Sequence, residues 1–180
     1  MRSTELRRAA VCRSRLTLNI TKHRTTWERR QMEPIEIRSD SRHRLLAASP
    51  SEVFAAMSDP TRVARWWGPT GFTNTIELFE FKPGGKWLLT MHGPDGKDYP
   101  NESRFTRIVA DQVFEIEHLN GHHFFLTIEL VPMHGGTEVR WRQTFDNVEH
   151  YERMAQFVAS ANEQNLDRLS AEVQAGRSAI

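Results

Sequence analysis

Six segments rich in β-branched and aromatic residues follow one another between residues 75 and 145, separated by short turns. The segments are Thr75 to Phe81, Lys86 to His92, Asp98 to Val109, Gln112 to Leu119, His122 to Val131 and Thr137 to Phe145. The turns are Pro83-Gly84-Gly85, Gly93-Pro94-Asp95-Gly96, Ala110-Asp111, Asn120-Gly121 and His134-Gly135-Gly136. Parallel neighbours need a crossover of a dozen or more residues, so connections this short join antiparallel strands. The sequence therefore predicts one antiparallel sheet.

A further strand and a long helix flank these segments. Ile35 to Ala48 is predicted as the first strand. Asp146 and Asn147 can cap a helix that runs from Val148 to about Ala175. Apolar residues recur along it at helical spacing, as expected for a helix with one buried face: Tyr151, Met154, Phe157, Val158, Ala161 and Leu169.

Two short helices are predicted between the first strand and the sheet segments. Ser49-Pro50-Ser51-Glu52 has the form of a capping box, with proline at the first helical position, and opens a helix through Ser58. Asp59 and Pro60 open the next, which ends at Trp66-Trp67 because Gly68-Pro69 stops it. Helices this short bury little by themselves. One or both indoles therefore either anchor the helices on the sheet or form a gate at a cavity mouth.

The faces of two strands can be assigned from their register. Apolar residues occupy even positions both in 112–119 and in 122–131. A two-residue loop would pair even with odd positions, whereas a three-residue loop, Leu119 to Gly121 with Gly121 left-handed, keeps the apolar faces together. His118 and His122 then become cross-strand neighbours on the apolar face.

The same reasoning extends to the neighbouring hairpins. A four-residue loop, Met133 to Gly136, places Trp141 and Gln143 on the apolar face. A two-residue turn at Ala110-Asp111 places Ser103 and Phe105 there. In Lys86 to His92 both faces carry large side chains, so the sequence does not decide which face of this strand is buried.

Composition favours one domain preceded by a basic tail. The chain has 180 residues and a net charge of +1, but Met1 to Gln31 holds nine Lys and Arg against two acidic residues. The remainder is net acidic, which gives no electrostatic reason to expect nucleic acid. The expected division is a disordered or over-extended tail at 1–31 and a domain at 32–176, with targeting or a charge-mediated contact as the tail's alternatives.

The cysteine count and the lengths of the apolar runs give an expectation for the cellular location. One cysteine, Cys12, allows no intramolecular disulfide. Neither a signal-peptide core nor a run of about 20 apolar residues is found, so we expect no membrane insertion and a cytoplasmic location.

Several motifs resemble one protein superfamily over about Pro34 to Glu172. They are Trp66-Trp67-Gly68-Pro69, Pro83-Gly84-Gly85-Lys86-Trp87, Gly93-Pro94-Asp95-Gly96 followed by Tyr99-Pro100-Asn101-Glu102, and Gly135-Gly136-Thr137. They resemble the START-like SRPBCC superfamily, in the branch similar to the C-terminal domain of the activator of the ninety-kilodalton heat-shock ATPase. The resemblance implies an α+β helix-grip fold, a curved antiparallel sheet wrapped around a long C-terminal helix. That fold hosts lipid binding, polyketide cyclisation and chaperone activation.

A curved sheet gripping one helix is expected to leave a cavity between them. We expect a small apolar or amphipathic ligand there, since such pockets are largely apolar with a few orienting polar groups. The predicted ligand-binding residues are Trp66, Ser103, Phe105, His118, His122, Phe124, Trp141, Gln143, Met154 and Phe157. The alternative for this set is a solid core in which the polar members are satisfied internally.

Metal binding and nucleophilic catalysis are the other candidate roles of this face. His118 and His122 lack an evident third ligand for a metal, and no nucleophile motif accompanies Ser103. We expect no cofactor and assign no catalytic residue. The alternative functions are a cyclase, dehydratase or hydrolase in the same cavity, and a module that interacts with a chaperone. A homodimer is a further expected partner arrangement.

Overall fold

The computed structural model describes residues 34–178, and the predicted basic tail, Met1 to Gln31, lies outside the described residues. The elements are η1 (Ile35–Arg38), β1 (Ser39–Leu46), α2 (Pro50–Ser58), α3 (Pro60–Trp66), β2 (Thr73–Phe79), β3 (Lys86–His92), β4 (Asp98–Val109), β5 (Val113–His118), β6 (Phe124–Met133), β7 (Gly136–Phe145) and α4 (Val148–Ser178).

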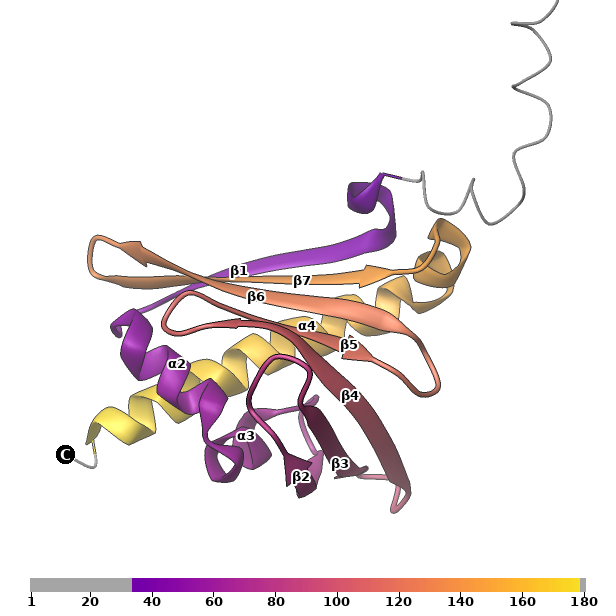
Figure 1. Ribbon diagram of the computed structural model, residues 1–180, viewed down its shortest axis with the longest axis horizontal. Coiled ribbons are helices and arrows are strands. Elements are labelled where there is room, and N and C mark those ends of the chain that lie inside the picture. Colours follow the sequence, from indigo (N-terminus) through magenta and orange to yellow (C-terminus); the bar gives the residue numbers. More distant parts are fainter. Residues whose placement is uncertain (1–33, 179–180) are drawn as a thin grey trace, which may run out of the picture. The chain divides into compact units, whose positions relative to one another are not determined.

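Seven strands form one antiparallel sheet in the order β1-β7-β6-β5-β4-β3-β2. The long helix α4 runs along one side of this curved sheet, and α2 and α3 lie beside its C-terminal half (Figure 1). It packs against β1, β7, α2 and α3. The predicted α+β helix-grip fold is confirmed.

The two short helices begin where the sequence predicted. Ser49 accepts a hydrogen bond from the Glu52 amide, and the Glu52 carboxylate accepts one from the Ser49 amide, which completes the capping box. Asp59 caps α3 by accepting a hydrogen bond from the Thr61 amide. Gly68 follows α3 at φ +90°, a left-handed conformation suited to glycine.

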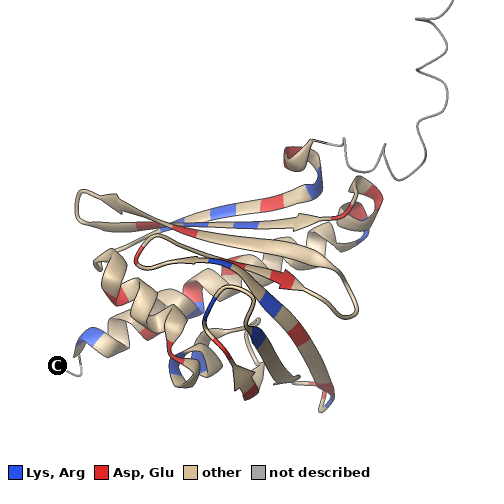
Figure 2. Cartoon of the chain, viewed as in Figure 1, with Lys and Arg blue, Asp and Glu red and all other residues tan. Residues whose placement is uncertain are grey.

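The first predicted strand is shorter than expected. Ile35–Arg38 is a 3-10 helix, and only Ser39–Leu46 pairs with β7. This strand carries Arg42 and Arg44. Both arginines form ion pairs with acidic residues of α4, including Glu163. Figure 2 shows Lys and Arg interspersed with Asp and Glu along β1 and α4.

The hairpin loops differ in length from the predicted ones, but the predicted faces are correct. The β5–β6 loop has five residues, so His118 pairs with Phe124, and the prediction that it pairs with His122 is wrong. Asn120 explains the longer loop, because its side chain bonds the backbone of β4 at Glu102 and Pro100. The observed loop of five residues and the predicted loop of three are both odd in length, so even-numbered residues of β5 still pair with even-numbered residues of β6.

The other two hairpins also have loops of unexpected length and keep the predicted faces. The β6–β7 loop has two residues instead of four, because Met133 pairs with Gly136. The β4–β5 turn has three instead of two, and a register shift between Phe105 and Arg107 compensates for the extra residue. Phe105 therefore still pairs with Ile116, as a two-residue turn would require. In β3, whose facing was open, Trp87 and Leu89 are buried.

One end of the sheet is filled by a solid aromatic cluster. Trp87 stacks on Phe105 at a centroid distance of 5.8 Å, and Phe79 meets both rings edge-on at 5.3 Å. Phe81 and Phe114 complete the cluster. These rings fill part of the space under the sheet, and an open volume remains beside Trp141 and the first half of α4.

Candidate functional site

A cavity of about 390 Å³ lies between the inner face of the sheet and α4. Its wall is formed by residues of the α3–β2 loop, of β3 to β7 and of α4, and most of them are apolar. The polar wall residues are Asn101, Ser103, His118, His122, Gln143, Asn162 and Asn165, with the hydroxyl of Tyr99 and the indole of Trp141. Lys, Arg, Asp and Glu do not contribute to the wall within residues 34–178.

Eight of the ten predicted ligand-binding residues line this cavity. They are Ser103, His118, His122, Phe124, Trp141, Gln143, Met154 and Phe157. Phe157 is 61% exposed and His122 is exposed as well, whereas Trp141 is only 2% exposed. The first two therefore lie near the mouth of the cavity, and Trp141 lies deep within it.

Two predicted positions, Trp66 and Phe105, do not line the cavity. Phe105 lies within the aromatic cluster and is fully buried. Trp66 is 1% exposed, and its Nε1 donates a hydrogen bond to the Ala56 carbonyl oxygen at 2.9 Å, which ties α3 to α2. The neighbouring Trp67 lines the cavity instead and contacts Trp87 and Trp141. Of the two adjacent indoles, Trp66 anchors α3 on α2 and Trp67 lines the cavity.

The loop that carries Trp67 is fixed by polar residues of α4. The Asn165 Oδ1 accepts a hydrogen bond from the Gly68 amide at 2.7 Å, and its Nδ2 donates to the Ala161 carbonyl oxygen. The Arg168 guanidinium donates to carbonyl oxygens of the same loop. These contacts position Trp67, Gly68 and Pro69 in the cavity wall.

His118 is held by oxygens on both sides of its ring. Its Nδ1 lies 2.9 Å from the His122 carbonyl oxygen and its Nε2 lies 2.9 Å from the Asn101 Oδ1. The Asn101 Nδ2 donates to the Tyr99 carbonyl oxygen, which leaves Oδ1 to face the histidine. The ring also stacks on Phe124 at 4.6 Å. Burial lowers the pKa of His118, although the hydrogen bond to His122 opposes this.

A second histidine pair lies at the cavity mouth. The His122 Nδ1 is 3.2 Å from the His150 Nε2, which links the β5–β6 loop to the first turn of α4. Burial, followed by the neighbouring His122, lowers the pKa of His150. Within residues 34–178 no three His, Cys, Asp or Glu side chains are grouped as ligands for a metal ion.

Gln143 meets a polar partner across the cavity wall. The Asn162 Nδ2 on α4 donates to the Gln143 Oε1 at 3.1 Å and to the Asp40 Oδ2 at 3.1 Å. Gln143 therefore lines the cavity and also has a protein partner for its Oε1.

Sequence reasoning missed four residues that shape the site, namely Trp67 as a wall residue, Asn162, Asn165 and Arg168. A signal for the two asparagines was present, because they fall at the spacing of the buried face that includes Val158, Ala161 and Leu169. A polar residue on a buried helical face needs a partner. Arg168 gave no comparable signal, since an arginine on a helix usually contacts solvent.

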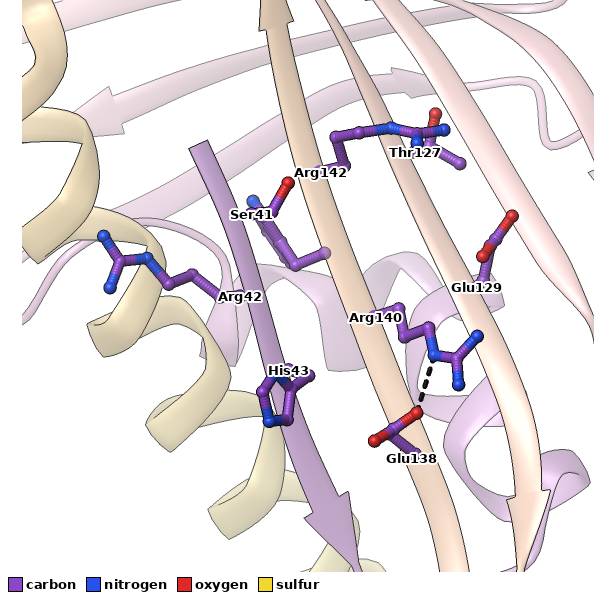
Figure 3. Close-up of a pocket in the computed structure, with 9 residues that line it drawn as sticks. Ser41, Arg42, His43, Thr127, Glu129, Glu138, Arg140 and Arg142 are labelled. Carbon is purple, nitrogen blue, oxygen red and sulfur yellow. Dashed lines mark hydrogen bonds and ion pairs between the residues drawn. The ribbon is translucent and has the colours of Figure 1, made fainter. Parts of the chain in front are cut away.

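A second hollow, of about 410 Å³, lies on the opposite face of the sheet over β1, β6 and β7. Figure 3 shows that its walls are polar, with Arg140 paired to Glu138 at 2.6 Å and Glu129 nearby. Arg140 and Arg142 are exposed. Because solvent-exposed side chains of both charges form its walls, this hollow lacks the apolar lining typical of ligand pockets.

The chain was compared with known proteins. The family model of the Activator of Hsp90 ATPase homolog 1-like protein matches residues 47–174. None of the curated proteins matches the chain. In the part of the chain that the structure describes, no helix has the length and hydropathy to cross a membrane.

Solved structures show the same fold. A protein from Arthrobacter aurescens is 26% identical, with a TM-score of 0.72 over 79% of this chain and 89% of its own. A protein from Nitrosomonas europaea is 17% identical, with a TM-score of 0.72 over 80% of this chain and 99% of its own. An AHSA1-like protein from Aeromonas hydrophila is 20% identical, with a TM-score of 0.62 over 77% of this chain and 93% of its own. Because the family model matches residues 47–174, more than half of the chain, the chain belongs to the Activator of Hsp90 ATPase homolog 1-like protein family.

Proposed function

We propose that this protein binds a small apolar or amphipathic molecule in the cavity between the sheet and α4. The observation that carries the proposal is the cavity itself, about 390 Å³ in volume and mostly apolar in its wall. Pockets for small molecules commonly measure about 300 to 1,000 Å³ and combine apolar walls with a few polar groups. The single cysteine fits a reducing compartment such as the cytoplasm.

The packing of the remaining core supports this proposal. Apolar voids cost stability in proportion to their volume, and protein interiors are otherwise close-packed. Here the aromatic cluster around Phe105 is tightly filled, while the neighbouring space beside Trp141 is open. The space under the sheet is thus filled by aromatic rings around Phe105 and open beside Trp141, as a ligand site requires.

The alternative functions have weaker support. A cyclase, dehydratase or hydrolase needs a free acid or base in the cavity. Both ring nitrogens of His118 face protein oxygens, and His122, the other histidine of the wall, lies at the mouth against His150. A chaperone-interacting module needs a contiguous exposed apolar patch. The exposed large apolar residues include Leu45 on β1 and Leu78 on β2, which are the two opposite edge strands of the sheet.

The test is binding of a neutral fluorescent probe, N-phenyl-1-naphthylamine, to the full chain. Ala161 lines the cavity, so Ala161→Phe should fill part of it and lower the probe affinity at least severalfold. Gln156→Phe adds the same ring at an exposed position of α4 and is the control that should keep wild-type affinity. Native mass spectrometry of the purified protein should also detect a co-purifying small molecule.

Two results would contradict the proposal. One is the absence of saturable probe binding to the wild type. The other is equal affinity of the wild type and a folded Ala161→Phe variant, since this would locate the probe outside the cavity.

A further inference from the structure

A buried carboxylate lies directly behind the cavity wall. Asp40 on β1 is 4% exposed and pairs in register with Gln143 of β7. Arg42 binds it through Nη2 to Oδ1 at 2.7 Å and through Nε to both carboxylate oxygens at 3.1 Å. Because the carboxylate forms an ion pair, it can only accept hydrogen bonds from its other neighbours.

This carboxylate fixes the orientation of the Asn162 amide. The atom of Asn162 that lies 3.1 Å from the Asp40 Oδ2 must be a donor, and is therefore the nitrogen Nδ2. The same nitrogen lies 3.1 Å from one atom of the Gln143 amide, which must therefore be an acceptor, the oxygen Oε1. Asp40 thus determines, through Asn162, that the Oε1 of Gln143 is the atom bonded to protein.

The other end of Gln143 is left as a donor at the cavity. Within residues 34–178 its Nε2 has no hydrogen-bond partner, and Gln143 lines the cavity. Two positions earlier on the same face of β7 lies Trp141, which also lines the cavity. Its Nε1 has no acceptor in the described part of the chain, but that atom also has almost no accessible surface, so a ligand in the cavity cannot reach it. The Gln143 Nε2 is not among the fully buried unpaired atoms of the described residues, which leaves it as the donor within reach of a ligand.

We propose that the Gln143 Nε2 binds an oxygen acceptor of the ligand, and that the ligand is an uncharged apolar molecule with a carbonyl group. This inference rests on the proposed ligand-binding function. An uncharged group is required because the cavity wall contains no Lys or Arg within residues 34–178. A ligand carboxylate would also be separated from the Asp40 carboxylate only by the side-chain amides of Gln143 and Asn162.

Two nearly isosteric compounds test the acceptor. The first, 2-acetylnaphthalene, has a carbonyl oxygen where 2-isopropenylnaphthalene has a methylene group. Both are measured by displacement of N-phenyl-1-naphthylamine from the full chain. The wild type should bind the ketone at least about tenfold more tightly, the discrimination expected of a site whose donor would otherwise stay unpaired. A third compound, 2-naphthoate, should bind more weakly than the ketone.

A variant then assigns the donor. Gln143→Met removes the N–H groups of the amide with little change of volume and should reduce the preference for the ketone severalfold. Gln156→Met makes the same substitution at an exposed position of α4 and is the matched control. It should keep the wild-type preference. Retained binding of the alkene shows that each variant folds.

The outcomes separate this inference from the proposed function. Equal affinities of ketone and alkene for the wild type overturn the inference, as does an unchanged preference in Gln143→Met. If the probe binds and neither naphthalene displaces it, the inference fails while the proposed function stands. If the probe itself does not bind, the proposed function fails, and the inference fails with it.

Discussion

Arg168 on α4 donates a hydrogen bond from Nη1 to the carbonyl oxygen of Gly68 at 2.7 Å, across 100 positions of sequence. The same guanidinium donates to four further carbonyl oxygens of this region, those of Arg65, Trp67, Pro69 and Phe72. Its partners within residues 34–178 are all backbone oxygens, and burial lowers the pKa of Arg168. One side chain thus closes the loop after α3, which would otherwise leave several carbonyl groups without partners.

Replacing this arginine should therefore be costly. Arg168→Gln should destabilise the protein by about 2 to 4 kcal/mol, because hydrogen bonds to a charged group contribute about 1.5 to 3 kcal/mol and several are lost together. Chemical denaturation measures the change. Arg153→Gln on the same helix removes only an exposed pair with Glu149 and should change stability by less than about 0.5 kcal/mol. Equal effects of the two substitutions would contradict the role of Arg168.

The adjacent indoles should respond differently to truncation. Trp66→Ala should cost about 3 to 5 kcal/mol, because the ring is fully buried and its Nε1 bonds Ala56. Trp67→Ala should cost less, since Trp67 is only half-buried, but it should change the affinity for N-phenyl-1-naphthylamine. Denaturation and probe titration of both variants make the comparison. A larger stability loss at Trp67 would refute the division of roles.

Two histidines should give opposite contributions to the pH dependence of stability. The pKa of His118 is lowered by burial, so the folded state takes up its proton less readily than the unfolded state. Its contribution is therefore favourable above the unfolded pKa of about 6.5 and is lost as the pH falls through the folded pKa. His118→Gln should reduce the loss of stability below pH 6.5.

His123 should behave in the opposite way. Burial alone lowers its pKa, but the hydrogen bonds that Asp146 and Glu117 accept outweigh burial and raise it. The stabilisation is present below the unfolded pKa and is lost as the pH rises through the folded pKa. His123→Gln should therefore cost more stability at pH 5.5 than at pH 8. Denaturation curves of both variants from pH 5 to 8 provide the test, and parallel pH profiles would contradict it.

Neighbouring glycines in the β2–β3 turn should differ in their tolerance of a side chain. A Cβ on Gly85 would lie 2.0 Å from the Glu80 carbonyl oxygen, and the Gly85 carbonyl oxygen accepts the amide of Phe105 in the core. Gly85→Ala should therefore cost about 3 kcal/mol or more. Gly84 has φ +80° but open space around it, so Gly84→Ala should cost about 1 to 2 kcal/mol. Thermal denaturation of the two variants measures the difference, and a milder effect at Gly85 would be inconsistent with the close contact.

The faces of the strands were predictable from the sequence, whereas the loop lengths were not. Alternation of side chains along a strand is a local property, so the parity of a connection is enough to decide which residues share a face. His118 and Gln143 were assigned correctly to the inner face although neither adjacent loop has its predicted length. Loop length itself depends on distant contacts, such as that between Asn120 and the backbone of β4.

The sequence by itself thus determined the order of the elements, the helix starts at Ser49 and Asp59 and the inward residues of the sheet, because caps and alternation act over a few positions. Only the tertiary structure decided that Trp67 rather than Trp66 lines the cavity. That choice depends on where α4 places Asn165 and Arg168 against the loop. The donor end of Gln143 was likewise set by Asp40 through Asn162, three side chains that meet only after β1, β7 and α4 have packed together.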